Sequence, residues 1–129
     1  MSDAVMGRTA ACHCGALSVR CEGEPTKVSL CHCFACQRRT GSTHSIAAFF
    51  LREQVQVEGP VQRYTRPSDR GFDVTFGFCP TCGSSVFWEP ERMPDRVGVA
   101  VGAFADPSFP APSQAVHAEC RHPWLSLPV

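Results

Sequence analysis

The sequence lacks the features that a protein needs to insert into a membrane or to bind a polyanion such as nucleic acid. None of its 129 residues falls in a run approaching the ~20 apolar residues that a bilayer-spanning helix needs. Lys+Arg and Asp+Glu are 12 each, so no net field attracts nucleic acid or an anionic membrane. Residues 1–8 lack a basic start followed by an apolar run, so no secretory signal is predicted. We therefore expect a cytoplasmic protein without nucleic-acid or membrane partners.

Long helices are also excluded, because 11 prolines and 10 glycines interrupt the chain. Apolar and polar residues alternate with period two in Phe72–Phe78 and Leu17–Cys21, which predicts strands. Val97–Val101 alternates valine with small residues and predicts a strand covered on both faces. Two further strands are expected at Ile46–Leu51 and Gln62–Thr65. Two short helical turns are expected at Phe34–Thr40 and Leu51–Gln54. The sequence thus predicts a mostly β fold.

Seven of the nine cysteines fall into three clusters, and without a secretory signal they are expected to be reduced. The clusters are Cys12-His13-Cys14, Cys31-His32-Cys33-Phe34-Ala35-Cys36 and Cys79-Pro80-Thr81-Cys82. Thiolate sulfur is a preferred ligand of zinc, and two cysteines one or two residues apart can hold one ion from a tight turn. The clusters predict metal sites rather than disulfides.

Spacing divides the seven thiolates between two ions. Cys79-x-x-Cys82-Gly83 has the shape of a zinc knuckle, and the Cys12/Cys14 pair supplies two more ligands, which together make a tetrahedral four-cysteine site. The remaining cysteines, Cys31, Cys33 and Cys36, can hold a second ion with one position open for water or a substrate sulfur. The alternative is a closed second site with His32 or His44 as its fourth ligand.

These motifs resemble the glutathione-dependent formaldehyde-activating (GFA) family, whose domain also occurs in centromere protein V. The resemblance is carried by Cys12-x-Cys14-Gly15, Cys31-His32-Cys33-x-x-Cys36-x-Arg38-x-x-Gly41-Ser42, Phe78-Cys79-x-x-Cys82-Gly83-Ser84 and the tail residues Pro123-Trp124. It runs from about Ala10 to Trp124, so we expect residues 1–129 to form a single GFA-type zinc-binding domain with its core at about residues 10–124. The resemblance implies an Mss4-like β-tent with zinc knuckles and short helical turns.

The resemblance also implies two zinc ions, a structural zinc on one cluster and a catalytic zinc on the other. The structural ligands would be Cys12, Cys14, Cys79 and Cys82, and the catalytic ligands Cys31, Cys33 and Cys36. The family's named activity joins glutathione to formaldehyde, giving S-(hydroxymethyl)glutathione, a carbon–sulfur lyase reaction run in reverse. We therefore expect a zinc-dependent carbon–sulfur lyase whose partners are a small thiol such as glutathione and an aldehyde.

Residues around the second cluster suggest how such a reaction would run. Three thiolates make zinc a poor activator of water, which favours capture of a substrate thiol. Arg38 or Arg39 could offset the charge of the site, anchor a substrate carboxylate, or simply be solvated. His44 or His32 is the candidate proton carrier.

Two other functions fit the same sequence. The first is a binding or scaffold module in which both zinc ions are structural. The second is a thiol redox enzyme, because methionine sulfoxide reductases have a related zinc-bearing fold. In that case Cys120, between Glu119 and Arg121, is the candidate reactive thiol, whereas Cys21 lies on the apolar phase of its strand and is expected to be buried.

Overall fold

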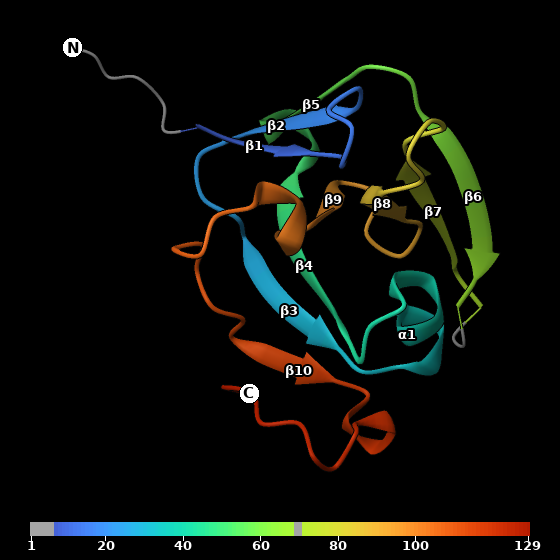
Figure 1. The fold of residues 1–129 in the computed structure, drawn as a ribbon, viewed down its shortest axis with the longest axis vertical. Coiled ribbons are helices and arrows are strands. Elements are labelled where there is room, and N and C mark those ends of the chain that lie inside the picture. The colour runs from blue at the N-terminus through green and yellow to red at the C-terminus, as the bar shows by residue number, and fades with distance from the viewer. Residues whose placement is uncertain (1–6, 69–70) are drawn as a thin grey trace.

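The computed structural model describes residues 7–68 and 71–129, which form two β-sheets and a few short helices (Figure 1). The smaller sheet has the order β1-β2-β5, with β1 (Gly7–Ala11), β2 (Ser18–Glu22) and β5 (Val55–Glu58). The larger sheet has the order β10-β3-β4-β9-β8-β7-β6. Its strands are β3 (Lys27–Cys31), β4 (Ser45–Leu51), β6 (Gln62–Pro67), β7 (Asp73–Phe78), β8 (Ser85–Pro90), β9 (Arg96–Ala100) and β10 (Gln114–Val116). The predicted mostly β class is confirmed.

The helical segments are short. They are α1 (Phe34–Thr40) and three 3₁₀ turns, η1 (Arg52–Gln54), η2 (Val101–Phe104) and η3 (Ala118–Cys120). Within the described residues, no helix has the length and apolar character needed to cross a membrane. All strand pairs are antiparallel except that between β10 and β3, which is parallel.

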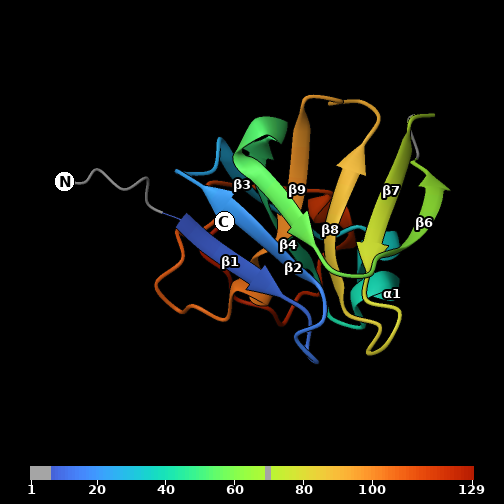
Figure 2. The same cartoon turned by 90° about the horizontal axis from the view of Figure 1, so that it is seen from above.

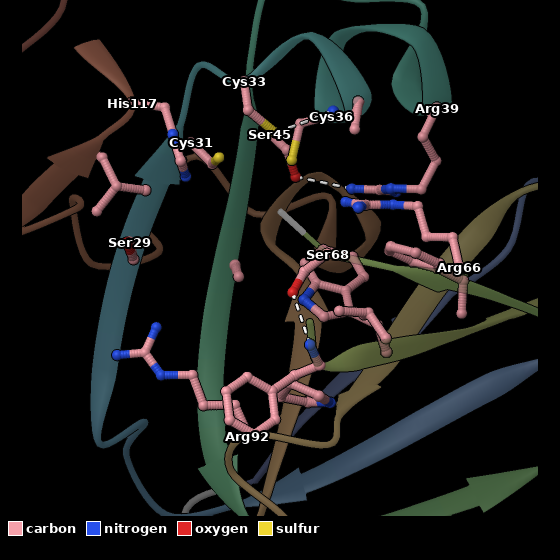
Figure 3. A pocket seen from close by; sticks show the side chains of 18 of the residues that line it. Ser29, Cys31, Cys33, Cys36, Arg39, Ser45, Arg66, Ser68, Arg92 and His117 are labelled. Carbon is pink, nitrogen blue, oxygen red and sulfur yellow. Dashed lines mark hydrogen bonds between the residues drawn. The ribbon is translucent and has the colours of Figure 1, made fainter. Parts of the chain in front are cut away.

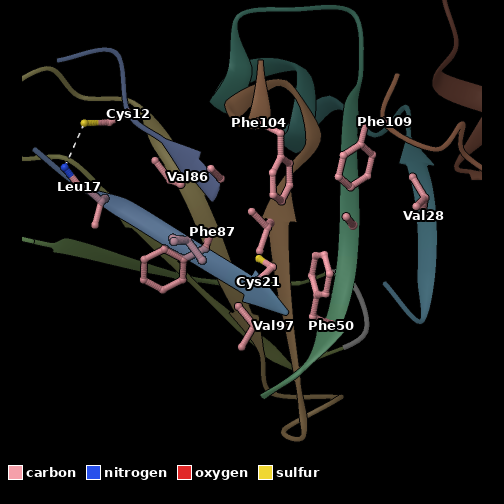
Figure 4. Close-up of a cluster of buried hydrophobic side chains, with 14 of the residues drawn as sticks. Cys12, Leu17, Cys21, Val28, Phe50, Val86, Phe87, Val97, Phe104 and Phe109 are labelled. Carbon is pink, nitrogen blue, oxygen red and sulfur yellow. Dashed lines mark hydrogen bonds between the residues drawn. The ribbon is translucent and has the colours of Figure 1, made fainter. Parts of the chain in front are cut away.

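The two sheets enclose the main hydrophobic core between them (Figures 2 and 4). The smaller sheet contributes Val19 and Cys21, which are fully buried. The larger sheet contributes alternate residues of β4 and β9, among them Phe50 and Val99, together with Phe87 of β8. Burial of these side chains is the main driving force that holds one sheet against the other.

The opposite face of the larger sheet carries a second, smaller apolar cluster. Its buried members are Ala47, Phe76 and Trp88, with Phe49, Val74 and Ala100 packed against them. Because side chains alternate along a strand, Ala47 faces this cluster whereas its neighbour Ala48 faces the main core. The larger sheet therefore separates the main core from a second surface, which forms the floor of the cavity described below.

Several predicted elements are present with small changes at their ends. The helical turn predicted at Phe34–Thr40 is α1, with the same bounds, and the strand predicted at Phe72–Phe78 is β7, which begins one residue later. Five strands were not predicted, namely β1, β3, β5, β8 and β10. In β8 and β3 three consecutive residues are buried, so period-two alternation is lost.

Gly98 shows how closely the larger sheet is packed. A Cβ at this position would lie 2.5 Å from Nε1 of Trp88, its cross-strand neighbour. We expect Gly98→Ala to lower the free energy of unfolding by about 1–3 kcal/mol, because the indole must shift or the strands must separate. Gly102→Ala is the matched control, since a Cβ there meets nothing within 4 Å. Urea unfolding of both variants measures the difference, and equal stabilities would contradict this account of the packing.

Cys21 supplies a pH-dependent prediction. Its side chain is 0% exposed, and burial raises the pKa of its thiol from 9.0 to about 12, although the charge of Arg8 opposes the shift. Since the folded protein holds the thiol neutral, this contribution to stability is complete below about pH 9 and is lost as the pH rises towards 12.

We therefore expect iodoacetamide at pH 9 to leave Cys21 unmodified in the native protein and to modify it in denaturant. The half-buried Cys120, outside both cysteine clusters, is the internal reference and should react in the native state. Peptide mass spectrometry measures the extent of alkylation at both cysteines. If Cys21 were modified as fast as Cys120 in the native protein, the burial argument would be refuted.

Candidate metal centres and the adjoining cavity

Four cysteines from two segments far apart in the sequence come together in the fold. The sulfur atoms of Cys12, Cys14, Cys79 and Cys82, here called the four-cysteine cluster, all lie within 4.8 Å of one another. Cys12 Sγ is 3.7 Å from Cys14 Sγ, which in turn is 3.6 Å from Cys79 Sγ. None of the nine cysteines, all of which lie in the described residues, forms a disulfide.

Two tight turns position these sulfur atoms. The first follows β1, where Gly15 has a φ of +85° and its N–H donates to the Cys12 carbonyl. The second follows β7, where Gly83 has a φ of +80° and its N–H donates to the Cys79 carbonyl. Glycine adopts these positive φ angles without strain. The two turns are joined by a hydrogen bond from the His13 N–H to Ser84 Oγ, 3.1 Å long.

Backbone amides point at the sulfur atoms, as expected where sulfur carries negative charge. The Leu17 N–H donates to Cys12 Sγ at 3.2 Å, and the amides of Thr81 and Cys82 lie 3.4 and 3.5 Å from Cys79 Sγ. Hydrogen bonds from the hydroxyl and the backbone of Ser84 lower the pKa of the Cys82 thiol to about 5. The cluster therefore contains thiolate at neutral pH, the form that binds metal.

The second group forms where β3 runs into α1. Cys31 ends the strand, Cys33 is the N-cap of the helix and Cys36 lies in its first turn. The sulfur atoms of Cys31, Cys33 and Cys36, here called the three-cysteine cluster, lie within 4.8 Å of one another. The Cys36 N–H donates to Cys33 Sγ at 3.3 Å, so one interaction both caps the helix and orients the sulfur.

No histidine nitrogen of residues 7–68 and 71–129 belongs to the three-cysteine cluster. His32 is 1% exposed, and burial, followed by the charge of Arg121, lowers the pKa of its imidazole. The Nδ1 atom of His44 is instead 2.9 Å from Thr43 Oγ1. This arrangement favours the open three-ligand site over the closed alternative.

The thiols of the three-cysteine cluster differ in how readily they lose their protons. A hydrogen bond from Cys31 lowers the pKa of Cys36 to about 6, and bonding from Cys33 and the charges of Arg39 and Arg66 act in the same direction. The same bond to Cys36 raises the pKa of Cys31, since Cys31 is the partner that keeps its proton. One thiolate is thus present at neutral pH before any cation binds.

Both donor sets fit zinc. A Zn–S bond of about 2.3 Å in a tetrahedron places sulfur atoms about 3.8 Å apart, close to the 3.6 and 3.7 Å found between sulfurs of the four-cysteine cluster. Four thiolates complete a tetrahedron, whereas the three-cysteine cluster supplies three corners. The seven cysteines therefore group as their spacing suggested, and the roles of the two clusters stay predictions.

A cavity of about 560 Å³ opens on the three-cysteine cluster (Figure 3). All three cysteines line it, and its aromatic lining consists of Phe34, Phe49, Phe72, Phe76 and Trp88. The charged residues in the lining are Arg38, Arg39, Arg66, Arg92, Asp73 and Glu119. Within the described residues, arginines thus outnumber carboxylates in the wall of this cavity. The combination suits a ligand with both apolar and anionic parts.

The predicted site residues differ in their relation to this cavity. Arg38 and Arg39 both line it, but Arg39 is the one held in place, since it donates to Ser45 Oγ at 2.9 Å and to Ser85 Oγ at 3.1 Å. Burial lowers the pKa of the Arg39 guanidinium, although the negative charge of Cys36 opposes the shift. Neither His44 nor His32 is among the described residues that line the cavity.

No pattern in the sequence identifies several of the residues that line the cavity. Arg66 reaches the cavity from β6, and Arg92 from the turn after β8. His117 follows β10, whose Val116 is the parallel partner of Cys31, and it has a φ of +57°. These side chains come together only through strand pairing between segments far apart in the chain. The proposed reactive Cys120 also lines the cavity.

Comparison with known proteins identifies one family and one similar solved structure. The model of the family described as "Glutathione-dependent formaldehyde-activating enzyme" matches residues 7–120. A solved crystal structure of a Rhodobacter sphaeroides protein is 26% identical, with a TM-score of 0.59, and the alignment covers 74% of this chain and 85% of that one. The comparison with curated proteins found no match. The match over residues 7–120 shows that this chain belongs to the glutathione-dependent formaldehyde-activating enzyme family.

Proposed function

We propose that this protein is a zinc-dependent carbon–sulfur lyase that adds a glutathione-like thiol to a small aldehyde. The observation that carries the proposal is the three-cysteine cluster, which supplies three ligands and faces a cavity large enough for a thiol substrate. Zinc bound there would favour the thiolate form of a substrate thiol at neutral pH. A second zinc on the four-cysteine cluster would be structural.

The chain's own residues have separate tasks in this proposal. Cys31, Cys33 and Cys36 would hold the zinc where they line the cavity, and the aromatic lining offers apolar surface to the substrate. Arg38 lines the cavity and is a candidate to anchor a glutathione carboxylate. The roles predicted for His44 or His32 in proton transfer stay predictions; their rings are 6.4 Å apart, so a proton path through both would need a bridging group.

The proposed reaction is a simple addition. The thiol sulfur forms a bond to the aldehyde carbon while the carbon–oxygen double bond becomes a single bond. The proton lost by the thiol ends on the former carbonyl oxygen, so the product is a hydroxymethyl thioether when the aldehyde is formaldehyde. No oxidant or reductant is consumed. The site has to bring the two reactants together and keep the thiol deprotonated, and both are effects of proximity and charge.

The test is to follow glutathione and formaldehyde by NMR exchange spectroscopy with and without the zinc-loaded protein. The proposal expects faster exchange between free glutathione and its adduct when catalytic amounts of the protein are present. Exchange at the rate of the protein-free mixture would refute it. The folded Cys33→Ala variant, which keeps the four-cysteine cluster, is the control for non-specific acceleration.

A further inference from the structure

Two arginines from different parts of the chain, Arg39 and Arg66, lie near each other in the cavity (Figure 3). The guanidinium carbon of Arg39 lies 4.7 Å from the centroid of Phe76, and that of Arg66 lies 5.4 Å from the same centroid. Arg39 also stacks on Trp88, at 4.5 Å. Aromatic faces attract guanidinium groups and hold them in a fixed plane, so both cations are oriented.

Both guanidinium groups have donors that the protein leaves unused. The Nε atoms of Arg39 and Arg66 are buried and, within the described part of the chain, have no hydrogen-bond partner. The other nitrogens of Arg39 are bound to neutral serine hydroxyls rather than to carboxylates. A buried donor without a partner is costly, which points to a ligand that accepts from it.

The charge around the pair is also unbalanced. Among residues 7–68 and 71–129, no carboxylate forms an ion pair with either arginine. Two like charges close together repel each other. A zinc ion with three thiolates would carry one net negative charge, and a bound substrate thiolate would add a second. The lining also contains Arg38 and Arg92 against two carboxylates, so positive charge in the cavity exceeds what the lining carboxylates offset.

The pair lies beside the three-cysteine cluster rather than at the far end of the cavity. Ser45, which accepts from Arg39, is the cross-strand partner of Cys31. Arg39 follows Cys36 by three residues on α1, so the two lie on neighbouring positions of one helix face, and both line the cavity. An anionic group bound between the two arginines would therefore lie only a few bonds from a sulfur or carbonyl carbon at the cluster.

We propose that Arg39 and Arg66 form an anion subsite that holds a carboxylate of the substrate next to the reacting atoms. The inference rests on the proposed function for the identity of those atoms and extends it to the substrate class. In glutathione both carboxylates are several bonds from sulfur, whereas this subsite favours a compact reactant. The carboxylate belongs either to a short acidic thiol or to an aldehyde acid.

Two matched pairs of small ligands distinguish these sources. Calorimetric titration of the zinc-loaded protein compares mercaptoacetate with 2-mercaptoethanol, and glyoxylate with acetaldehyde. We expect the acidic member of at least one pair to bind about tenfold tighter than the neutral member, as a charge-assisted hydrogen bond allows. A preference within the thiol pair places the carboxylate on the thiol, and one within the aldehyde pair places it on the aldehyde.

Arg66→Gln should abolish this preference, and Arg39→Lys should reduce it because lysine lacks the planar fork. Arg63→Gln is the control, since Arg63 is on the same strand β6 but is exposed and is not among the described lining residues. Circular dichroism checks that each variant folds. If Arg66→Gln does not fold, the ligand preference of Arg39→Lys alone tests the proposal.

Equal affinities within both pairs would overturn the anion subsite. So would a preference that folded Arg66→Gln retains, or, where Arg39→Lys decides, one that Arg39→Lys leaves undiminished. A preference for glyoxylate that Arg66→Gln removes, together with no binding of either thiol, would support the subsite and count against the proposed thiol site. Failure of the subsite and failure of the proposed function thus give different results.

Discussion

Replacing Cys79 with alanine should unfold the protein. Its side chain is 0% exposed and its sulfur lies between the turn that follows β7 and the turn that follows β1. Structural zinc contributes about 10 kcal/mol or more to the folding of small zinc domains, which is comparable to the whole stability of a typical domain. The expected result is loss of bound zinc and of the cooperative thermal transition, measured by metal analysis and circular dichroism.

Cys120→Ala is the matched control for this substitution. Cys120 is half-buried and belongs to neither cluster, so its removal should keep the full zinc content and change the melting temperature little. If Cys79→Ala kept the wild-type melting temperature and zinc content, the four-cysteine cluster would not be a structural metal site.

Replacing Cys33 with alanine should abolish catalysis while the fold survives. Cys33 contributes one of three sulfur atoms to its cluster and caps α1 by accepting from the Cys36 N–H. Loss of a helix cap costs about 1 kcal/mol, so a folded protein is expected, whereas a centre with two remaining ligands should lose its zinc. Adduct formation from glutathione and formaldehyde should fall to the rate without protein.

Two measurements on this variant make the prediction specific. Metal analysis should show that one zinc stays bound, and circular dichroism should show a thermal transition only slightly below that of the wild type. Retained acceleration by folded Cys33→Ala protein would place the chemistry elsewhere in the molecule. The contrast with Cys79→Ala then separates a cluster needed for folding from one needed for reaction.

Local sequence signals are enough to predict part of this structure. The alternation from Phe72 to Phe78 predicts β7, although burial along the strand is not strictly alternate, since the neighbours Phe76 and Gly77 are both buried. Paired cysteines in short turns predict the grouping of sulfur atoms, because Cys-x-Cys and Cys-x-x-Cys segments bring their sulfurs together without help from the rest of the fold.

The cavity could not be predicted in the same way. Arg66 and Phe76 are ten residues apart in the chain and meet through antiparallel pairing of β6 with β7, while Arg39 joins them from α1. Trp88 lies on β8, where three consecutive residues are buried and no alternation marks the strand. Such neighbours depend on sheet order and register, which single-sequence patterns do not encode.

The central claim is that the three-cysteine cluster holds a metal ion with a position open to a substrate thiol. It is tested most directly by adding glutathione to the cobalt-substituted protein and recording its visible spectrum. An open centre predicts a saturable spectral change that is absent in Cys33→Ala and present in Cys120→Ala. A spectrum that glutathione leaves unchanged would mean that the site is closed by a fourth protein ligand, as in a purely structural or scaffold module.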